Sequence, residues 1–369
     1  MKKNLLRFAA QGLLTFFAAG VAATEIPRSS TLAFGSCLYP TQSQPVWQAV
    51  EALDPAAFVF LGDNMYADKG PYAQQPDPQR IANAYRDLGN TPAYRDFRSN
   101  AAARGTALFA VWDDHDYGIN DGGGDYPHRL VSKGYFLDFF GLEETASGGA
   151  DEPGVHQSYS LTVNDLQVQL ILLDTRSFRS PLKRSDDKNA CPPTGMIAET
   201  DPHATVLGEA QWQWLAEELE KPADMRILAS SIQVIPEQHC FEKWANFPRE
   251  RTRLLQLLKD TRASGVIIIS GDRHLAEISR LDAEHIGYPL YEITSSGLNS
   301  ALGRIPFIAH TASKEANRHR AFANNILADN FGAIAIEGEG ADAILRLQIH
   351  DANGTLLQEI PVALAGLKP

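Results

Sequence analysis

The sequence has few cysteines, a deficit of basic residues and no strongly apolar run beyond its N-terminal stretch. Its three cysteines, Cys37, Cys191 and Cys240, are an odd number, so at least one thiol stays unpaired in an oxidising compartment. Cys37 ends a predicted β-strand and is therefore the candidate for a metal ligand. Spacing alone does not test disulfide geometry, so whether Cys191 and Cys240 pair stays open.

Acidic residues outnumber basic ones, with 45 Asp and Glu against 33 Lys and Arg and a formal net charge of −12. Such a protein is a poor non-specific binder of nucleic acid, because the nucleic-acid backbone is itself densely negative. We therefore expect no stable nucleic-acid binding. A phosphate group would have to be held by bound metal ions and a few placed arginines.

The N-terminal stretch has the pattern of a processing signal. Basic residues precede a short apolar run at 8–19, and small residues follow at 21–23. This order predicts a secretory signal peptide over residues 1–23. An uncleaved membrane anchor is the alternative, which the shortness of the run disfavours. No Arg-Arg pair is present, so we expect the general secretory route, a periplasmic or extracellular location and no transmembrane segment in the mature chain.

Strand-like and helical patterns alternate through the first two thirds of the chain, and strands dominate the rest. The predicted strands are 31–35, 57–61, 107–112, 158–163, 168–173, 226–232, 266–270, 290–294, 332–336 and 343–349. The predicted helices are 45–53, 78–103 with a break at Gly89 or Pro92, 129–140, 208–220 and 249–262. This pattern predicts an α/β (α+β) fold with two packed mixed β-sheets flanked by helices, because so many strands fit two sheets better than one. No linker divides the chain, so we expect a single catalytic domain over residues 31–350 and a C-terminal tail at 351–369.

Five short motifs each end a predicted strand in potential metal ligands. They are FGSC at 34–37, LGDNMYAD at 61–68, WDDHDYG at 112–118, LLDTR at 172–176 and SGDRH at 270–274. A single strand followed by carboxylates is common and does not by itself indicate a metal site. Five that share Asp, His, Cys and Tyr indicate one site along the carboxyl edge of a sheet, where open α/β folds bind ligands. The pattern indicates a metallohydrolase.

The predicted metal ligands come from four of these motifs. They are Cys37, Asp63, Tyr66, Asp114, Asp272 and His274. Two adjacent metal ions need a shared carboxylate, and Asp63 is the candidate for it. A tyrosine beside a cysteine ligand favours a trivalent ion such as ferric iron. Asp272 and His274 are separated by one residue, so an extended strand end would point both to one centre.

The other polar side chains of the motifs are assigned to catalysis or support. His115 is the predicted acid for the leaving group. Arg176 and Arg273 are candidates for gripping phosphate oxygens, with a structural ion pair as the alternative for each. Neighbouring side chains of a strand point to opposite faces, so the four residues at 113–116 cannot all bind the same metal ion. The expected supporting residues around the ligands are Asn64, Asp113 and Asp116.

In order and spacing, the motifs resemble the alkaline phosphatase D (PhoD)-like branch of the calcineurin-like metallophosphatases. The resemblance covers about Thr31 to Gly297. Its features are Ser36-Cys37, Gly62-Asp63 with Tyr66, Trp112 to Asp116, Asp174 to Arg176, and Gly271-Asp272 with His274. The segment Gln233–Arg251, with Glu242 and Trp244, is similar to a further stretch of that family.

The resemblance implies a metallophosphatase four-layer sandwich with a dinuclear centre. A ferric ion (Fe3+) would be bound through Cys37, Asp63 and Tyr66, completed by Asp272 or His274. Asp63 would bridge to a second, divalent ion that Asp114 also holds. Calcium (Ca2+) is the expected second ion, with Zn2+, Mn2+ or Mg2+ as alternatives.

Together these inferences predict a secreted or periplasmic dinuclear phosphohydrolase of the alkaline phosphatase or phosphodiesterase type. A metal-bound hydroxide would attack phosphorus in line, and His115 would protonate the leaving oxygen. The expected substrate is a small phosphate ester or a phospholipid headgroup. The alternatives are a phospholipase- or nuclease-like phosphodiesterase on the same fold, and a non-catalytic secreted metal-binding protein that uses the loop Asn120–Asp125.

Overall fold

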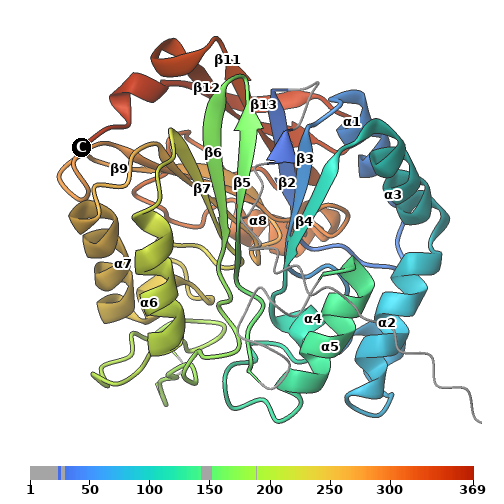
Figure 1. Ribbon diagram of the computed structural model, residues 1–369. Helices are drawn as coiled ribbons and strands as arrows, with labels where there is room; N and C mark the ends of the chain where they lie inside the picture. The colour runs from blue at the N-terminus through green and yellow to red at the C-terminus, as the bar shows by residue number, and fades with distance from the viewer. Residues whose placement is uncertain (1–23, 26–29, 143–151, 188) are drawn as a thin grey trace, which may run out of the picture.

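The computed structural model describes residues 24–25, 30–142, 152–187 and 189–369. The predicted signal peptide, residues 1–23, lies outside this part of the chain. Two mixed β-sheets pack in the middle of the molecule with helices on their outer sides (Figure 1). This confirms the predicted fold class.

One sheet has six strands in the order β13-β12-β11-β2-β3-β4. Its strands are β2 (Thr31–Gly35), β3 (Ala57–Leu61), β4 (Ala107–Val111), β11 (Asn330–Glu337), β12 (Ile344–Asp351) and β13 (Leu356–Ala363). The neighbours β2, β3 and β4 are parallel, so their carboxyl ends lie at one edge. β3 is buried along its whole length, as expected for a strand covered on both faces.

The expected C-terminal tail is part of this sheet. β13 pairs antiparallel with β12, with Leu347 opposite Ile360. The side chains of β13 are mostly exposed or half-buried, with Val362 buried. The alternation of buried and exposed side chains along β13 is weak, as is common in an edge strand. For this reason the pattern of residues 351–369 did not predict the strand.

The other sheet has seven strands in the order β1-β5-β6-β7-β8-β10-β9. Its strands are β1 (Thr24–Glu25), β5 (Gln157–Val163), β6 (Leu166–Leu172), β7 (Met225–Ser230), β8 (Val266–Ser270), β9 (Ala276–Leu281) and β10 (Leu290–Ser295). The four central strands β6, β7, β8 and β10 are parallel. Their carboxyl ends therefore form a second edge that can carry functional residues.

The helices of the described residues are α1 (Val46–Ala52), α2 (Gln79–Asn90), α3 (Pro92–Arg104), α4 (Asp114–Tyr117), α5 (Arg129–Phe140), α6 (Gly208–Leu219), α7 (Pro248–Asp260) and α8 (Pro306–Ala312). The helices α6 and α7 lie on one side of the sheets, and α1, α2, α3 and α5 lie on the other (Figure 1). The predicted break in the long helical segment falls at Thr91, whose extended backbone (ψ 122°) suits a residue before proline. Among the helices of the described residues, none is long and apolar enough to cross a membrane.

The cysteines have separate roles in the fold. Cys191 and Cys240 form a disulfide, which settles the pairing that the spacing left open. Cys37 is free and fully buried. It is therefore available as a ligand.

Candidate metal centre

Candidate ligands from both sheets converge on one place. The chain after β2, β3 and β4 supplies one set and the chain after β8 supplies the other. An isolated bridge between Ser36 and Ser296 joins the end of β2 to the end of β10 and holds the two sheet edges together. Among the described residues, the groups of three potential ligands whose atoms lie within 4.8 Å of one another are Cys37, Asp63 and His274; Asp63, Asp114 and His115; Asp113, Asp114 and Asp272; and Asp114, Asp121 and Glu242.

Several of these residues have a strained backbone. The φ angles of Cys37, Asp63, Asp272 and His274 are 63°, 49°, 68° and 53°, in the left-handed region that non-glycine residues rarely adopt. Such conformations collect at functional sites, where the surrounding structure enforces them. Asp272 and His274 are not extended, and they fall in different groups of neighbouring ligands.

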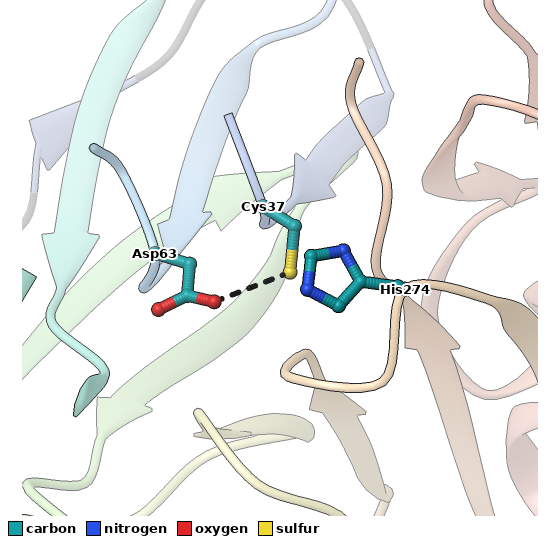
Figure 2. Close-up of side chains that lie close together, drawn as sticks. All are labelled: Cys37, Asp63 and His274. Atoms are coloured by element: carbon teal, nitrogen blue, oxygen red, sulfur yellow. Dashed lines mark hydrogen bonds between the residues drawn. The ribbon is translucent and has the colours of Figure 1, made fainter. Parts of the chain in front are cut away.

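The first group combines sulfur, phenol, carboxylate and imidazole donors. Figure 2 shows Cys37 between the carboxylate of Asp63 and the ring of His274, with its Sγ 3.5 Å from Asp63 Oδ2. The Tyr66 hydroxyl donates to the same oxygen at 3.0 Å and lies 3.4 Å from Nε2 of His274. His274 donates its Nδ1–H to the carbonyl of Ser300 at 2.8 Å. This bond leaves the Nε2 lone pair free for a metal, the usual arrangement of a ligating histidine.

The second group consists mainly of carboxylates and shares Asp63 with the first. Asp114 lies in all the groups that contain Asp113, His115 or Asp272. Its Oδ2 accepts the backbone N–H of Asp121 at 2.6 Å, while its Oδ1 is buried and accepts no hydrogen bond within the described structure. Asp63 therefore stands between a mixed donor group and a carboxylate group, as a bridging ligand must.

His115 lies at the edge of the second group. Its Nδ1 is 2.6 Å from Asp68 Oδ1, and its Nε2 is 4.0 Å from Asp114 Oδ1. Burial alone would lower the pKa of His115, but the charges of Asp114 and Asp68 outweigh burial and raise that pKa. The ring is therefore suited to hold a proton inside the site.

The expected supporting residues hold the ligand loops in place. Asp116 accepts hydrogen bonds from the backbone N–H groups of Asp63 and Asn64 at 3.2 and 3.3 Å, and from that of Asp113 at 2.6 Å. The side chain of Asn64 donates to the carbonyl of Val111, which ties the loop after β3 to β4. Asp113 also has a buried Oδ2 without a hydrogen bond in the described part of the chain, so it can contribute to the carboxylate group directly.

The two arginines have different environments. Arg176 is fully buried, and its guanidinium bonds Asp113 Oδ1 through Nε at 2.6 Å and Glu242 Oε2 through Nη1 at 2.7 Å. Its charge is thus neutralised by carboxylates inside the protein, which favours the structural ion pair over the phosphate grip as the role of Arg176. Arg273 is 4 % exposed and pairs through Nη2 with Glu315 at 2.7 Å, while its Nε has no acceptor in the described structure. Arg273 can still donate to a substrate.

Sequence reasoning gave no role to several residues that the structure places here. Asp68 belongs to the LGDNMYAD motif, so its position beside the ligands was a usable signal. Glu242 lies in a segment noted only for its resemblance to the family. Ser296, whose Oγ is 3.0 Å from the sulfur of Cys37, and Tyr39, whose ring stacks on Tyr66 at 3.8 Å, had no sequence signal.

The electrostatics show that burial opposes the ionised forms of several of the candidate ligands. Burial raises the pKa of Cys37 to about 11. Burial and neighbouring negative charges raise the pKa of Asp63 and of Asp272 well above the usual range. Cations among these groups would favour their ionised forms and satisfy the unpaired oxygens of Asp113 and Asp114. The donor set therefore fits metal ions.

Comparisons with known proteins agree with this arrangement. Residues 158–345 match the family model of the PhoD-like phosphatases. The alkaline phosphatase D of Bacillus subtilis (strain 168) is 26 % identical in an alignment of 302 positions that covers 73 % of this chain and 49 % of that protein. The chain thus spans about half the length of the curated relative it matches.

Two solved structures share the fold. One, described as the structure of PhoD, has a TM-score of 0.61 and 19 % identity and aligns over 89 % of this chain and 71 % of its own. The other, described as GAP50, the anchor in the inner membrane complex of Plasmodium, has a TM-score of 0.52 and 14 % identity over 90 % of this chain and 88 % of its own. The PhoD-like family model matches half of this chain. The chain therefore belongs to the PhoD-like phosphatase family, as its motifs predicted.

Proposed function

We propose that this protein is a metal-dependent phosphoric ester hydrolase that works in the periplasm or outside the cell. The observation that carries the proposal is Asp63, which lies in a group with Cys37 and His274 and in another with Asp114 and His115. Family membership supports phosphoester chemistry, and the donor groups support a dinuclear site. The N-terminal pattern supports export.

The donor chemistry favours different ions on the two sides of Asp63. Thiolate, phenolate and imidazole from Cys37, Tyr66 and His274 suit ferric iron. The oxygens of Asp114 and Asp272 suit a hard divalent ion, with calcium as the proposed occupant. Ions held there by Cys37, Asp63, Tyr66, Asp114, Asp272 and His274 would supply an activated water and charge stabilisation for a displacement at phosphorus.

The protein's own side chains supply the remaining tasks. His115 gives a proton to the leaving oxygen, and Asp68 orients its ring through Nδ1. Arg273 donates to the phosphoryl oxygens through the N–H groups that Glu315 does not occupy. Asp116, in α4, fixes the loop of Asp63 and Asn64 by accepting hydrogen bonds from their backbone N–H groups.

We propose small phosphate esters, phospholipid headgroups included, as substrates. The net charge of −12 disfavours long polyanions such as nucleic acid. Parallel assays with monoester and diester chromogens separate a phosphatase from a phosphodiesterase. If neither is hydrolysed while metal is bound, the protein is a metal-binding protein without catalysis.

Metal content and colour test the centre itself. Elemental analysis of protein purified without chelator is expected to give iron and a second metal in similar amounts. A tyrosinate–iron(III) pair absorbs visible light, so the protein should be coloured and Tyr66→Phe should lose that band. Colourless protein that contains only zinc would contradict the assignment of iron.

The role of His115 predicts a dependence on the leaving group. His115→Asn should slow hydrolysis of an alkyl phosphate ester by about 10²- to 10⁴-fold, the range for a lost general acid. A nitrophenyl ester should lose much less, because its leaving oxygen needs no proton. Steady-state kcat values for both ester types in the two proteins measure this, and an equal loss on both would contradict the acid role.

A further inference from the structure

A five-residue arm, His239–Lys243, crosses the site beside Arg273 and is fixed at several points. Cys240 is joined to Cys191 by the disulfide. The ring of Phe241 lies under the Arg273 guanidinium, 4.3 Å from its central carbon to the ring centroid. Glu242 pairs with two buried arginines, one of which is Arg176. Such a loop is held in one conformation, which is how binding groups are preorganised.

Lys243 closes the arm on itself. Its Nζ donates to the carbonyls of His239 and Phe241 at 2.6 and 3.1 Å. Both Lys243 and His239 are about 95 % buried. The arm therefore fixes the position of the His239 ring, and no hydrogen bond to Nε2 is needed to hold it there.

His239 has one donor that nothing in the described structure uses. Its Nδ1 accepts the backbone N–H of Phe241 at 3.3 Å. Burial and the charges of Arg273 and Lys243 hold the pKa of His239 well below its usual value, so the ring is neutral. A neutral ring that accepts at Nδ1 carries its proton at Nε2, and this Nε2 is buried with no partner among the described residues.

The charges around the Nε2–H donor of His239 favour an anion as its ligand. Arg273 has a buried Nε that also lacks an acceptor there. The cations Arg273 and Lys243 repel a proton from His239, and they would repel a metal ion for the same reason. A histidine that packs in a core usually has both ring nitrogens satisfied, because an unpaired buried donor is costly. An oxyanion would supply the acceptor that each of these donors lacks.

We propose that Nε2–H of His239 and Nε–H of Arg273 form a binding site for a phosphoryl oxygen. This site favours an anion, whereas the neighbouring carboxylate cluster favours cations. This deepens the proposed function and rests on it for the identity of the natural ligand. His239 thereby becomes a substrate-binding residue on an arm that the disulfide and Lys243 hold in place. Inorganic phosphate, the product of a monoesterase, is the simplest ligand of the site.

The test compares two replacements of similar size. His239→Leu removes the donor, and His239→Gln keeps an N–H donor on a neutral side chain. His203→Ala, at an exposed histidine remote from the arm in sequence, is the control. The probe is inorganic phosphate, added to the metal-loaded protein, and the readouts are its inhibition constant for ester hydrolysis and the rise in Tm that it produces.

For His239→Leu we expect a phosphate inhibition constant about 10-fold higher, kcat/KM lower by about 10- to 100-fold, a smaller phosphate-induced rise in Tm and unchanged metal content. His239→Gln should stay within about 3-fold of the parent protein, since it retains a donor. If His239→Leu does not fold, His239→Ala takes its place.

Wild-type phosphate affinity in His239→Leu, or equal losses in the Leu and Gln proteins, would overturn the site. The Tm readout separates this from the proposed function. A parent protein that hydrolyses no ester but loses its phosphate-induced stabilisation in His239→Leu would refute the enzyme proposal and support the anion site.

Discussion

If the proposed dinuclear centre is correct, Asp63→Asn should abolish ester hydrolysis and the binding of at least one metal ion. The substitution keeps the shape of the side chain and an oxygen for the Tyr66 hydroxyl, but it removes the charge that two adjacent groups of ligands share. Replacing residues that only orient ligands costs about 10- to 100-fold in affinity or activity, so loss of the shared ligand should exceed about 100-fold in kcat/KM. Steady-state kinetics combined with elemental analysis of the purified variant measure both effects.

Asp165→Asn is the matched control for this change. Asp165 is also an aspartate with a left-handed backbone (φ 63°), but it lies exposed at the turn between β5 and β6. Its replacement should leave turnover, metal content and stability unchanged. Unaltered turnover and metal content in Asp63→Asn would refute the bridging role and with it the dinuclear site.

Arg176→Met should destabilise the fold by about 3–5 kcal/mol, because it leaves buried carboxylates without their cation. Arg176 has no exposed surface and bonds both Asp113 and Glu242. Arg179 still pairs with Glu242, so the uncompensated charge is mainly that of Asp113. For a chain of this size the loss corresponds to a decrease in Tm on the order of 5 °C, which thermal unfolding at constant metal concentration detects.

The same substitution distinguishes the two roles considered for Arg176. Arg86→Met is the control, because Arg86 forms an exposed pair with Asp87 and such pairs contribute little. A stable Arg176→Met protein with a much higher KM would favour the phosphate grip. A lower Tm in Arg176→Met, with Arg86→Met unchanged, would support the structural ion pair.

The strand-end motifs were predictable because their signal is local. Continuous apolar runs such as 57–61 and 266–270 form fully buried strands, and polar residues directly after them must lie at the carboxyl edge. The break between α2 and α3 was predictable for the same reason, since proline restricts the residue before it. β9 and β13 were missed because an interrupted or half-exposed strand lacks a clear two-residue period.

The roles of individual ligands were harder to predict, because they depend on backbone conformation and on distant partners. Asp272 and His274 appeared suited to one centre, but they have left-handed φ angles and fall in different groups. Arg176 could be either a substrate or a structural residue until Asp113 and Glu242, 63 and 66 positions away, were found around it. Local sequence patterns do not report contacts between residues that lie so far apart in the chain.

Thus the amino-acid sequence by itself determined the family, the α/β layers and the residue types that follow each buried strand. The tertiary structure decided which of those side chains meet, because two sheets joined at Ser36 and Ser296 bring together loops that lie far apart in the sequence, such as those of Cys37 and Ser300, which are 263 residues apart. It also decided the sign of charge in each part of the site. Carboxylates and a thiol gather around Asp63, while Lys243 and Arg273 form a cationic neighbourhood around the neutral ring of His239, and this separation arises only when burial and distance are fixed together.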